Sequence, residues 1–291
     1  MNKLSVIAGK SSEDLARKLS KKIKANLVKS QIRVFADGES KITLKGNLSK
    51  KRSIVVQSIY PPVDTNLIRA LSLISKAKET SSEVIAVIPY MGYARQDREF
   101  LDGEIITIGV VGKLLKASGV KKVLTVDIHS KLALKELKIS SENVSAMEGL
   151  VKHFKKMKMK DPLVVSPDLG GQERAKEFAS LLKIGSIALK KHRDRKTGKV
   201  NIISEKVVVK NRDLIIVDDM ISTGGSIIKA TQFLKRQKCK RVFVACTHAL
   251  LVNNAAKKIK SAGVSQIIST NTIPGDSAKV DVSKVISDAL K

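Results

Sequence analysis

The chain alternates between short apolar runs and longer stretches whose apolar residues recur at helical spacing. The short runs predict strands at 4–8, 32–35, 54–56, 84–88, 123–126, 163–165, 187–189, 214–217 and 242–246. The amphipathic stretches predict helices at 66–78, 105–116, 172–182 and 226–236. Several runs, such as 54–56, are apolar throughout, as strands covered on both faces of a parallel sheet are. The alternation indicates an α/β fold.

A further helix is expected close to the N-terminus. Ser11 with Asp14 is a plausible helix start. Leu15, Leu19, Ile23 and Leu27 then repeat at helical spacing, which predicts a helix that reaches Leu27.

The strand–helix–strand pattern occurs twice at a nearly constant offset. Residues 54–56 align with 214–216 and, at the same offset, 66–70 align with 226–230; residues 84–87 meet 242–245 after a slip of two. Chance similarity between two strand–helix units is the alternative to a true duplication. The repeat predicts two similar α/β domains, 1–145 and 146–291, joined near 143–150, with the last residues of the chain packing on the N-terminal domain.

Charge is the strongest compositional signal. Lys and Arg number 55 against 27 Asp and Glu, which gives a net charge of +28 and an isoelectric point near 10.1. Such a field attracts phosphorylated metabolites, nucleic acids and acidic membranes. A solvated Lys-rich surface and a nucleic-acid face both fit this balance. Aromatic residues make up 3% of the chain and Trp is absent, so bases have few stacking partners, and no specific nucleic-acid partner is expected.

Other features point to a cytoplasmic protein. The two cysteines, Cys239 and Cys246, rule out a disulfide framework. No apolar run approaches the roughly 20 residues of a membrane-spanning helix, so no membrane association is expected. The N-terminal run 4–8 is too short for the core of a signal peptide.

The segment 214–226 carries the clearest chemistry. Its apolar start is followed by two carboxylates, Asp218 and Asp219, then by small residues and two glycines, Gly224 and Gly225, and then by a helix. Open α/β sheets bind ligands at the carboxyl ends of their strands, and N–H groups at a helix N-terminus bind anions. Glycines let the backbone approach a phosphate, whereas the carboxylates would repel it and suit sugar hydroxyls or a metal ion. The segment therefore predicts a sugar-phosphate site.

The segment 214–226 resembles the ribose-phosphate binding loop of the type I phosphoribosyltransferases. Along nearly its whole length the chain is similar to one branch of them, the ribose-phosphate pyrophosphokinases. Four further segments carry this similarity: 35–39, 89–98, 125–130, 165–175, together with the charged stretch 189–198. The resemblance implies two similar tandem type I phosphoribosyltransferase-like domains, each a mainly parallel sheet flanked by helices.

For ATP, the resemblance implies two sets of residues. One set lies on a loop that reaches a neighbouring subunit, which makes the active unit at least a dimer with an inter-subunit ATP site: Phe35, Asp37, Gly38 and Glu39. The other set follows a buried strand: Arg95, Gln96 and Asp97. An Arg side chain suits phosphate because it forms charge-assisted hydrogen bonds.

Metal ligands are expected in two segments. Asp127 and His129 are two apart at a predicted strand end, so both are expected to point the same way. The resemblance implies a magnesium ion, carried by ATP, at His129 and a second metal position at Asp168. An imidazole is an unusual ligand for Mg²⁺, and a lone His is more often structural.

The remaining implied residues bind ribose 5-phosphate or act on the transferred group. The pyrophosphate loop comprises Asp168, Gly170 and Gly171, and the catalytic pair on a flexible loop comprises Lys191 and Arg193. The charge density of 189–198 and Gly198 themselves predict a mobile loop or hairpin tip. The ribose 5-phosphate set is Arg193, Asp218, Asp219, Ser222, Thr223, Gly224, Gly225 and Ser226.

The implied reaction is diphosphoryl transfer from ATP to the C1 hydroxyl of ribose 5-phosphate, with Mg²⁺ as cofactor. Three alternatives are an ordinary nucleobase phosphoribosyltransferase, a non-catalytic relative that binds a partner, and a nucleic-acid-binding regulator. Arg95 and Gln96 argue against the first, and Lys191 and Arg193 against the second; no helix-turn-helix or aromatic RNA motif supports the third. Ser222 departs from the acid that many relatives carry there.

Overall fold

The computed structural model describes residues 4–193, 200–202 and 207–291. The chain forms two compact units. The first comprises Met1–Ala146, Asn271–Gly275 and Asp281–Lys291, and the second comprises Met147–Thr270 and Asp276–Val280. The chain therefore leaves the first unit after Ala146, returns to it at Asn271–Gly275, enters the second unit again at Asp276–Val280 and ends in the first.

The first unit is built on a seven-stranded sheet of order β3-β2-β1-β4-β5-β6-β7. Its strands are β1 (Leu4–Ala8), β2 (Asn26–Val34), β3 (Ser40–Lys45), β4 (Arg52–Val56), β5 (Glu83–Val87), β6 (Lys122–Val126) and β7 (Ser140–Val144). Its helices are α1 (Glu13–Lys22), α2 (Val63–Lys78), α3 (Thr107–Ala117), α4 (Lys131–Glu136) and α9 (Ser283–Ala289), with a 3₁₀ turn at Lys10–Ser12. Neighbouring strands are parallel except for the β2–β3 hairpin.

The second unit is built on a six-stranded parallel sheet of order β15-β14-β13-β12-β8-β9. Its strands are β8 (Leu163–Ser166), β9 (Ser186–Ala188), β12 (Asp213–Ile221), β13 (Arg241–Ala249), β14 (Val264–Thr270) and β15 (Ala278–Val280), and a separate hairpin pairs β10 (Lys191–Arg193) with β11 (Val200–Ile202). Its helices are α5 (Met147–Lys155), α6 (Gln172–Leu182), α7 (Gly225–Arg236) and α8 (Ala255–Ser261).

The two sheets have the same strand order. The run β2-β1-β4-β5-β6-β7 of the first unit corresponds to β9-β8-β12-β13-β14-β15 of the second. The additional strands, β3 in one unit and β10–β11 in the other, enter at the same point of the chain, before β4 and before β12. The repeat in the sequence is therefore a repeat of topology, and each unit is a parallel sheet flanked by helices, as expected.

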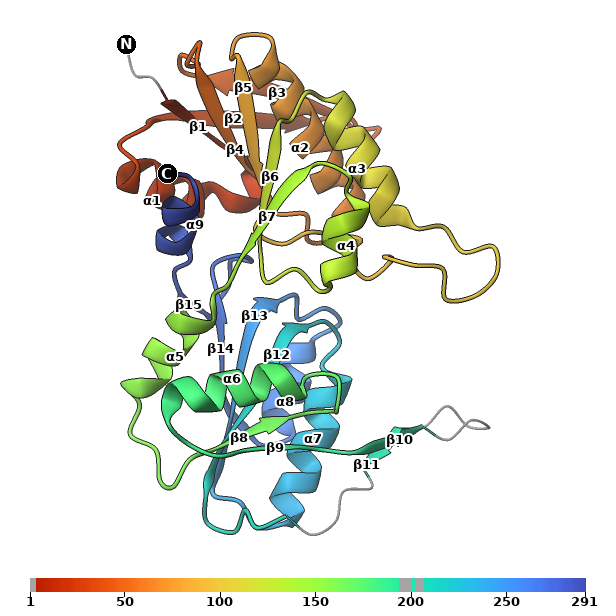
Figure 1. Ribbon diagram of the computed structural model, residues 1–291, viewed down its shortest axis with the longest axis vertical. Coiled ribbons are helices and arrows are strands. Elements are labelled where there is room, and N and C mark those ends of the chain that lie inside the picture. The colour runs from red at the N-terminus through yellow and green to blue at the C-terminus, as the bar shows by residue number, and fades with distance from the viewer. Residues whose placement is uncertain (1–3, 194–199, 203–206) are drawn as a thin grey trace. The chain divides into compact units, whose positions relative to one another are not determined.

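Alternate side chains of each buried strand pack on opposite helical layers. In β4, Val55 packs in the cluster under α2 and α3, whereas Ile54 and Val56 pack with α1 and α9; Figure 1 shows these helices on the two faces of the sheet. In β12, Leu214 and Ile216 pack with α7 and α8, and Ile215 and Val217 with α5 and α6. Burial of one such side chain contributes about 1.5–3 kcal/mol, so the double-sided packing explains why these strands are apolar throughout.

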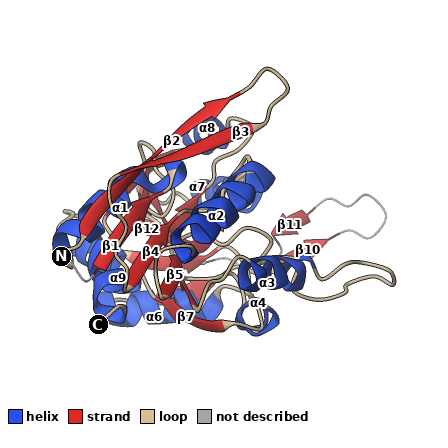
Figure 2. Cartoon of the chain, turned by 90° about the horizontal axis from the view of Figure 1, so that it is seen from above, coloured by secondary structure: helices blue, strands red, loops and turns tan. Residues whose placement is uncertain are grey.

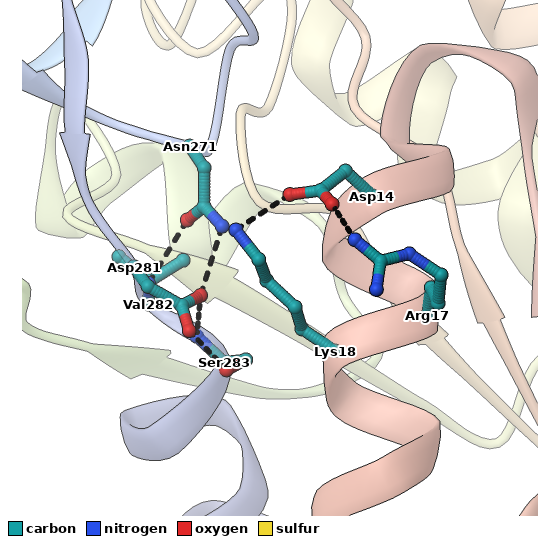
Figure 3. Close-up of polar contacts among 7 residues, drawn as sticks. All are labelled: Asp14, Arg17, Lys18, Asn271, Asp281, Val282 and Ser283. Carbon is teal, nitrogen blue, oxygen red and sulfur yellow. Dashed lines mark hydrogen bonds and ion pairs between the residues drawn. The ribbon is translucent and has the colours of Figure 1, made fainter.

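Each unit contains the helix that follows the last strand of the other unit's sheet. Helix α5 follows β7 in the chain and packs against α6, whereas α9 follows β15 and packs against α1. Asp281 accepts hydrogen bonds from the N–H and hydroxyl of Ser283 at 3.0 and 2.7 Å and so caps the start of α9 (Figure 3). Asn271 donates to Asp281 at 2.8 Å and accepts from the N–H of Val282 at 2.9 Å. These hydrogen bonds link Asn271 to residues 281–283 and hold the start of α9, the helix that packs on α1.

The first helix ends earlier than its periodicity predicts. Lys24 has a left-handed backbone with φ of 52°, and the N–H of Ala25 bonds to the carbonyl of Ser20 at 2.9 Å, which closes the helix in a Schellman arrangement. Leu27, expected in the helix, instead lies in β2 opposite Val6. The apolar residues of α1 and those of β2 happen to follow one helical spacing in the sequence, although the helix ends at Lys22.

Strand lengths also differ from expectation. The strand predicted at 32–35 is the end of a nine-residue strand, β2, and its antiparallel partner β3 was not expected because it is polar and half exposed. Strand β12, predicted to end at Val217, continues through the acid pair to Ile221 because its backbone stays paired with β13. In the described ranges, no helix has both the length and the apolar character needed to cross a bilayer.

A buried carboxylate anchors the start of β12. The Asp213 side chain is fully buried, lies 2.5 and 3.0 Å from two nitrogens of Arg241 and accepts from the N–H of Lys160 at 2.6 Å. The Arg241 bond holds the pKa of Asp213 below its usual value, although burial acts in the opposite direction.

We predict that Asp213→Asn lowers the free energy of unfolding by about 2 kcal/mol at pH 7, the contribution of a hydrogen-bonded charged group. Because the pKa of Asp213 is lowered by folding, this contribution is present above its unfolded value and is lost as the pH falls through its folded value. Urea unfolding followed by circular dichroism at pH 7 and pH 3 measures both effects.

The matched control is Asp161→Asn. It removes the ion pair between Asp161 and Arg212, in which the Asp161 side chain is 67% exposed. This change should cost under about 1 kcal/mol. Equal losses in the two variants, or a loss at Asp213 that does not shrink at low pH, would contradict the assignment.

Candidate active site

The acid pair lies within the last part of β12. Asp218 is paired with Cys246 of β13 and is partly buried, and the side chain of Asp219 is only 7% exposed. Burial, together with the charge of Asp219, raises the pKa of Asp218 to about 8. Two adjacent carboxylates in this position are electrostatically costly, and a ligand that supplies positive charge or hydroxyl donors relieves that cost.

Arg174 was not assigned a role from the sequence, yet it contacts both acids. Its Nη1 lies 3.6 Å from Oδ1 of Asp218 and 3.5 Å from Oδ1 of Asp219. Arg174 lies in the first turn of α6, which follows β8, and β8 is the neighbour of β12 in the sheet. The motif 165–175 contained this residue, but only the strand order places it beside the acid pair.

The start of α7 has the form of an anion site. Thr223, Gly225 and Ser226 are exposed, and Ser222 is partly buried just after β12. The first N–H groups of a helix have no partner within it, and the N-cap residue is Gly224, which has no side chain to cap them. The loop therefore presents backbone donors to solvent beside Asp218 and Asp219.

The two glycines of this loop differ in their surroundings. Gly224 has φ of 76°, and a Cβ there would lie 2.7 Å from Cδ1 of Ile259, so the fold itself requires glycine. A Cβ on Gly225 would meet no atom closer than Oγ1 of Thr223 at 4.0 Å. Neither packing nor a positive φ requires glycine at 225, which leaves space for a ligand to approach the backbone.

The expected pyrophosphate loop has a similar division. A Cβ on Gly171 would lie 2.7 Å from Oγ of Ser166, whereas one on Gly170 would reach only Oδ1 of Asp168, at 3.4 Å. Asp168 accepts from the N–H of Gly171 at 3.2 Å, and its carbonyl accepts from the Ser166 hydroxyl at 2.6 Å. One glycine is packed and the other faces open space. Asp168 closes the turn.

The expected catalytic pair lies in the hairpin of the second unit. Lys191 and Arg193 are the first and last residues of β10, which pairs with β11. The hairpin expected from the sequence is therefore present. The side chains of both residues, and the stretch 194–199 with Gly198, lie outside the part of the chain that is described.

The first unit brings two sequence motifs into one pocket. Arg95, Gln96, Phe100 and His129 line a pocket of about 540 Å³. The side chains of Arg95, Gln96 and His129 are all exposed, although Gln96 and His129 lie 33 positions apart in the sequence. A basic, an amide and an imidazole side chain around one pocket suit a phosphate-bearing ligand.

Asp97 joins the two motifs. It is 3% exposed, accepts a short hydrogen bond from the Ser130 hydroxyl and is paired with Arg98 at 3.1 Å. The Arg98 bond lowers the pKa of Asp97 despite the opposing effect of burial, and the Ser130 bond lowers it further. Of the three residues expected to bind ATP here, Asp97 is thus engaged within the protein, and it fixes Arg95 and Gln96 beside the loop of His129.

The geometric argument for Asp127 and His129 was wrong. Strand β6 ends at Val126, and Asp127 has φ of 39°, so the alternation of a strand does not apply to these two residues. Asp127 accepts from the N–H of Ala146 at 3.1 Å and so helps to hold the loop, while His129 reaches the pocket.

Metal ligation by protein side chains alone finds limited support. Within the described residues, no three His, Cys, Asp or Glu side chains gather into a cluster that could hold an ion. Mg²⁺ commonly takes one or two carboxylates and completes its shell with water and substrate oxygens. Asp218 and Asp219 fit that pattern best, because they combine buried negative charge with an open anion site beside them.

The remaining ATP-binding candidates lie apart from the pocket. Phe35, Asp37, Gly38 and Glu39 form the tip of the β2–β3 hairpin, which extends outward in Figure 2. The Phe35 ring is 40% exposed and lies under the guanidinium of Arg33 at 5.3 Å. Asp37 accepts from the N–H of Glu39 at 3.0 Å, and Gly38 has φ of 92°, so both shape the turn.

The first unit has no counterpart of the acid pair at the equivalent place. After β4 the chain reads Gln57-Ser58-Ile59. Gln57 is fully buried, its amide donates to Oδ1 of Asn66 at 3.1 Å, and a Cβ on Gly9 would lie 2.0 Å from its Oε1. Ser58 is also buried and donates to the carbonyl of Thr272 at 2.6 Å. The alignment of 54–56 with 214–216 puts Ser58 and Ile59 opposite Asp218 and Asp219, so two buried, uncharged residues fill this place.

Comparison with known proteins agrees with these features. A family model described as the N-terminal domain of ribose phosphate pyrophosphokinase matches residues 4–119, and one described as a phosphoribosyl synthetase-associated domain matches residues 193–290. Ribose-phosphate pyrophosphokinases of Methanobrevibacter smithii and Methanopyrus kandleri are 33% and 35% identical to the chain, covering 98% of it in both cases and 99% and 98% of the relatives.

A solved structure has the same fold over the whole chain. The phosphoribosylpyrophosphate synthetase from Mycobacterium smegmatis matches with a TM-score of 0.85 and 26% sequence identity, covering 99% of this chain and 97% of that one. The two repeated units, the acid pair beside an open helix N-terminus and these similarities lead to one conclusion: the chain belongs to the ribose-phosphate pyrophosphokinase family, whose members are diphosphotransferases.

Proposed function

We propose that the protein transfers the diphosphoryl group of ATP to the C1 hydroxyl of ribose 5-phosphate, releasing AMP. The hydroxyl attacks the β-phosphorus in line, and the bond between that phosphorus and the oxygen of AMP breaks. Such a transfer depends on positioning and on neutralisation of charge. Cys239 and Cys246 are buried and unpaired, which supports the expectation of a cytoplasmic enzyme.

The end of β12 and the start of α7 together provide the strongest support for this function. The N–H groups of Thr223 to Ser226 would bind the 5-phosphate, and Asp218 and Asp219 would hold the ribose hydroxyls. The open space in front of Gly225 supports a close approach of the phosphate to the backbone. A ligand that is anionic at one end and rich in hydroxyls at the other matches both halves of this surface.

ATP would be held by Arg95 and Gln96, with His129 at the same pocket. The hairpin tip with Phe35 projects away from this pocket, which supports a role in the ATP site of a neighbouring subunit. The active enzyme is then at least a dimer. Asp97 serves the ATP site by holding its two loops together rather than through direct contact.

Charge on the transferred group would be neutralised by Lys191 and Arg193. Gly170 of the pyrophosphate loop would allow close approach of the diphosphate. Asp218 and Asp219, with His129 and Asp168 at the other expected positions, would hold Mg²⁺, which supplies charge neutralisation at phosphate and hydroxyl oxygens when bound.

We predict that AMP forms only when the protein is given ATP, ribose 5-phosphate and Mg²⁺ together. Separation of the nucleotides by anion exchange, with each component omitted in turn, measures this. Formation of ADP would instead indicate an ordinary kinase. The absence of any turnover by folded protein, with and without added phosphate, would favour a non-catalytic member of the family.

Gly225, which has open space in front of it, allows a test of the phosphate end of the site. Gly225→Ala should raise the KM for ribose 5-phosphate at least tenfold, because the new methyl occupies the space in front of the helix N-terminus. Folding should be unaffected, since Ala is a better helix former than Gly. Initial rates over a range of ribose 5-phosphate concentrations, with thermal unfolding in parallel, test this.

Gly109→Ala in α3 is the control. Its Cβ would meet the carbonyl of Glu136 at 3.8 Å, an ordinary contact, so KM should stay within twofold of the wild type. A normal KM in Gly225→Ala would remove the α7 N-terminus from the phosphate site.

A third prediction concerns catalysis. Lys191→Ala should lower kcat by about 10²–10³, the usual effect of losing one contact to the transition state, with an unchanged melting temperature. Lys210→Ala, which removes an exposed lysine on the other side of the hairpin segment, should leave kcat within twofold. A kcat near that of the wild type in Lys191→Ala would exclude this residue from the mechanism.

A further inference from the structure

Arg174 occupies the space between two parts of the second unit. Its Nη1 is within 3.6 Å of both acids of the pair, and it also lies 4.0 Å from the position of a Cβ on Gly171. One guanidinium thus stands at the junction of the acid pair and the glycine turn expected to bind the diphosphate.

The contact with the acids is electrostatic rather than tightly bonded. Charge-assisted hydrogen bonds from Arg to carboxylate are usually about 2.7–2.9 Å long, and the pair of Arg241 with Asp213 approaches this at 2.5 and 3.0 Å. The distances of Arg174, 3.5 and 3.6 Å, are longer, and its side chain is 30% exposed. Arg174 compensates the charge of the pair without being locked to it.

A cation that arrives at the acid pair must therefore compete with a cation that the protein already supplies. Once the pair is neutralised from outside, the attraction that holds Arg174 there is removed, and the two cations repel each other. The glycine turn 170–171 lies close to the guanidinium, 4.0 Å from Nη1 to the Cβ position of Gly171, and the proposed function places an anionic diphosphate there.

We propose that Arg174 is an exchangeable counter-ion of the acid pair, which it neutralises in the empty enzyme and releases when the metal-bound ribose arrives, turning to the diphosphate instead. This inference rests on the proposed function. Arg174 thereby has two roles: it keeps Asp218 and Asp219 in place before substrate binds, and it contacts the diphosphate afterwards, so that occupation of the acid pair depends on both substrates.

The alternative is a structural arginine that only ties α6 to β12. The two roles differ in what removal of the side chain does to cation binding. Loss of a competitor strengthens the binding of a cation to the acids, whereas loss of a strut lowers stability and leaves that affinity unchanged or weaker.

The test uses the full chain without substrates and Mn²⁺ as probe, because Mn²⁺ takes the same oxygen ligands as Mg²⁺. Free Mn²⁺ is measured by electron paramagnetic resonance for the wild type, Arg174→Gln, Arg174→Lys and a control, Arg236→Gln, which removes an exposed arginine at the end of α7. We expect Arg174→Gln to bind Mn²⁺ at least tenfold more tightly, and the other two variants to stay within threefold of the wild type.

Unchanged or weaker Mn²⁺ binding by folded Arg174→Gln would overturn the proposal, as would equal tightening in Arg236→Gln. Steady-state kinetics supply a second readout: kcat of Arg174→Gln should fall at least tenfold while the KM for ribose 5-phosphate does not rise, with partial recovery in Arg174→Lys. A wild type that binds Mn²⁺ but forms no AMP would contradict the proposed function, whereas an active wild type with unaltered Mn²⁺ binding in Arg174→Gln would contradict only the role of Arg174.

Discussion

The structure of the second unit depends on the placement of two adjacent carboxylates at the end of a buried strand. Asp218 and Asp219 lie in β12, between β8 and β13, where water solvates them poorly. The raised pKa of Asp218 expresses this cost. Arg174 offsets part of it, and the open N-terminus of α7 adds a partial positive charge nearby. We propose that a ligand with hydroxyls or a bound metal ion offsets the remaining cost.

Duplication of the fold has not duplicated this site. The two sheets share a strand order, but the first unit fills the equivalent place with Ser58 and Ile59, both buried, and Ser58 is bonded within the unit. Its candidate ATP pocket lies instead beside His129, where Asp97 ties two loops together. The repeated scaffold thus presents a different surface in each unit, as the proposed binding of two unlike substrates requires.

Much of the fold could be predicted because its strands are apolar on both faces and its helices are amphipathic. The sequence did not reveal β3, which is polar, or the end of α1, where an apolar period ran on into β2. The candidate site was predicted from glycines and carboxylates that mark its motifs in the sequence. The contacts of Arg174 and Asp97 could not, because strand order and loop packing bring together residues that are far apart in the chain.

We propose that each chain holds a single ribose-phosphate site, at the end of β12. Isothermal titration of the full chain with ribose 5-phosphate in the presence of Mg²⁺ tests it most directly, with a variant that carries both Asp218→Asn and Asp219→Asn alongside. One molecule should bind per chain, and the folded double variant should show no measurable binding. Two molecules bound per chain, or binding that survives in the double variant, would contradict it.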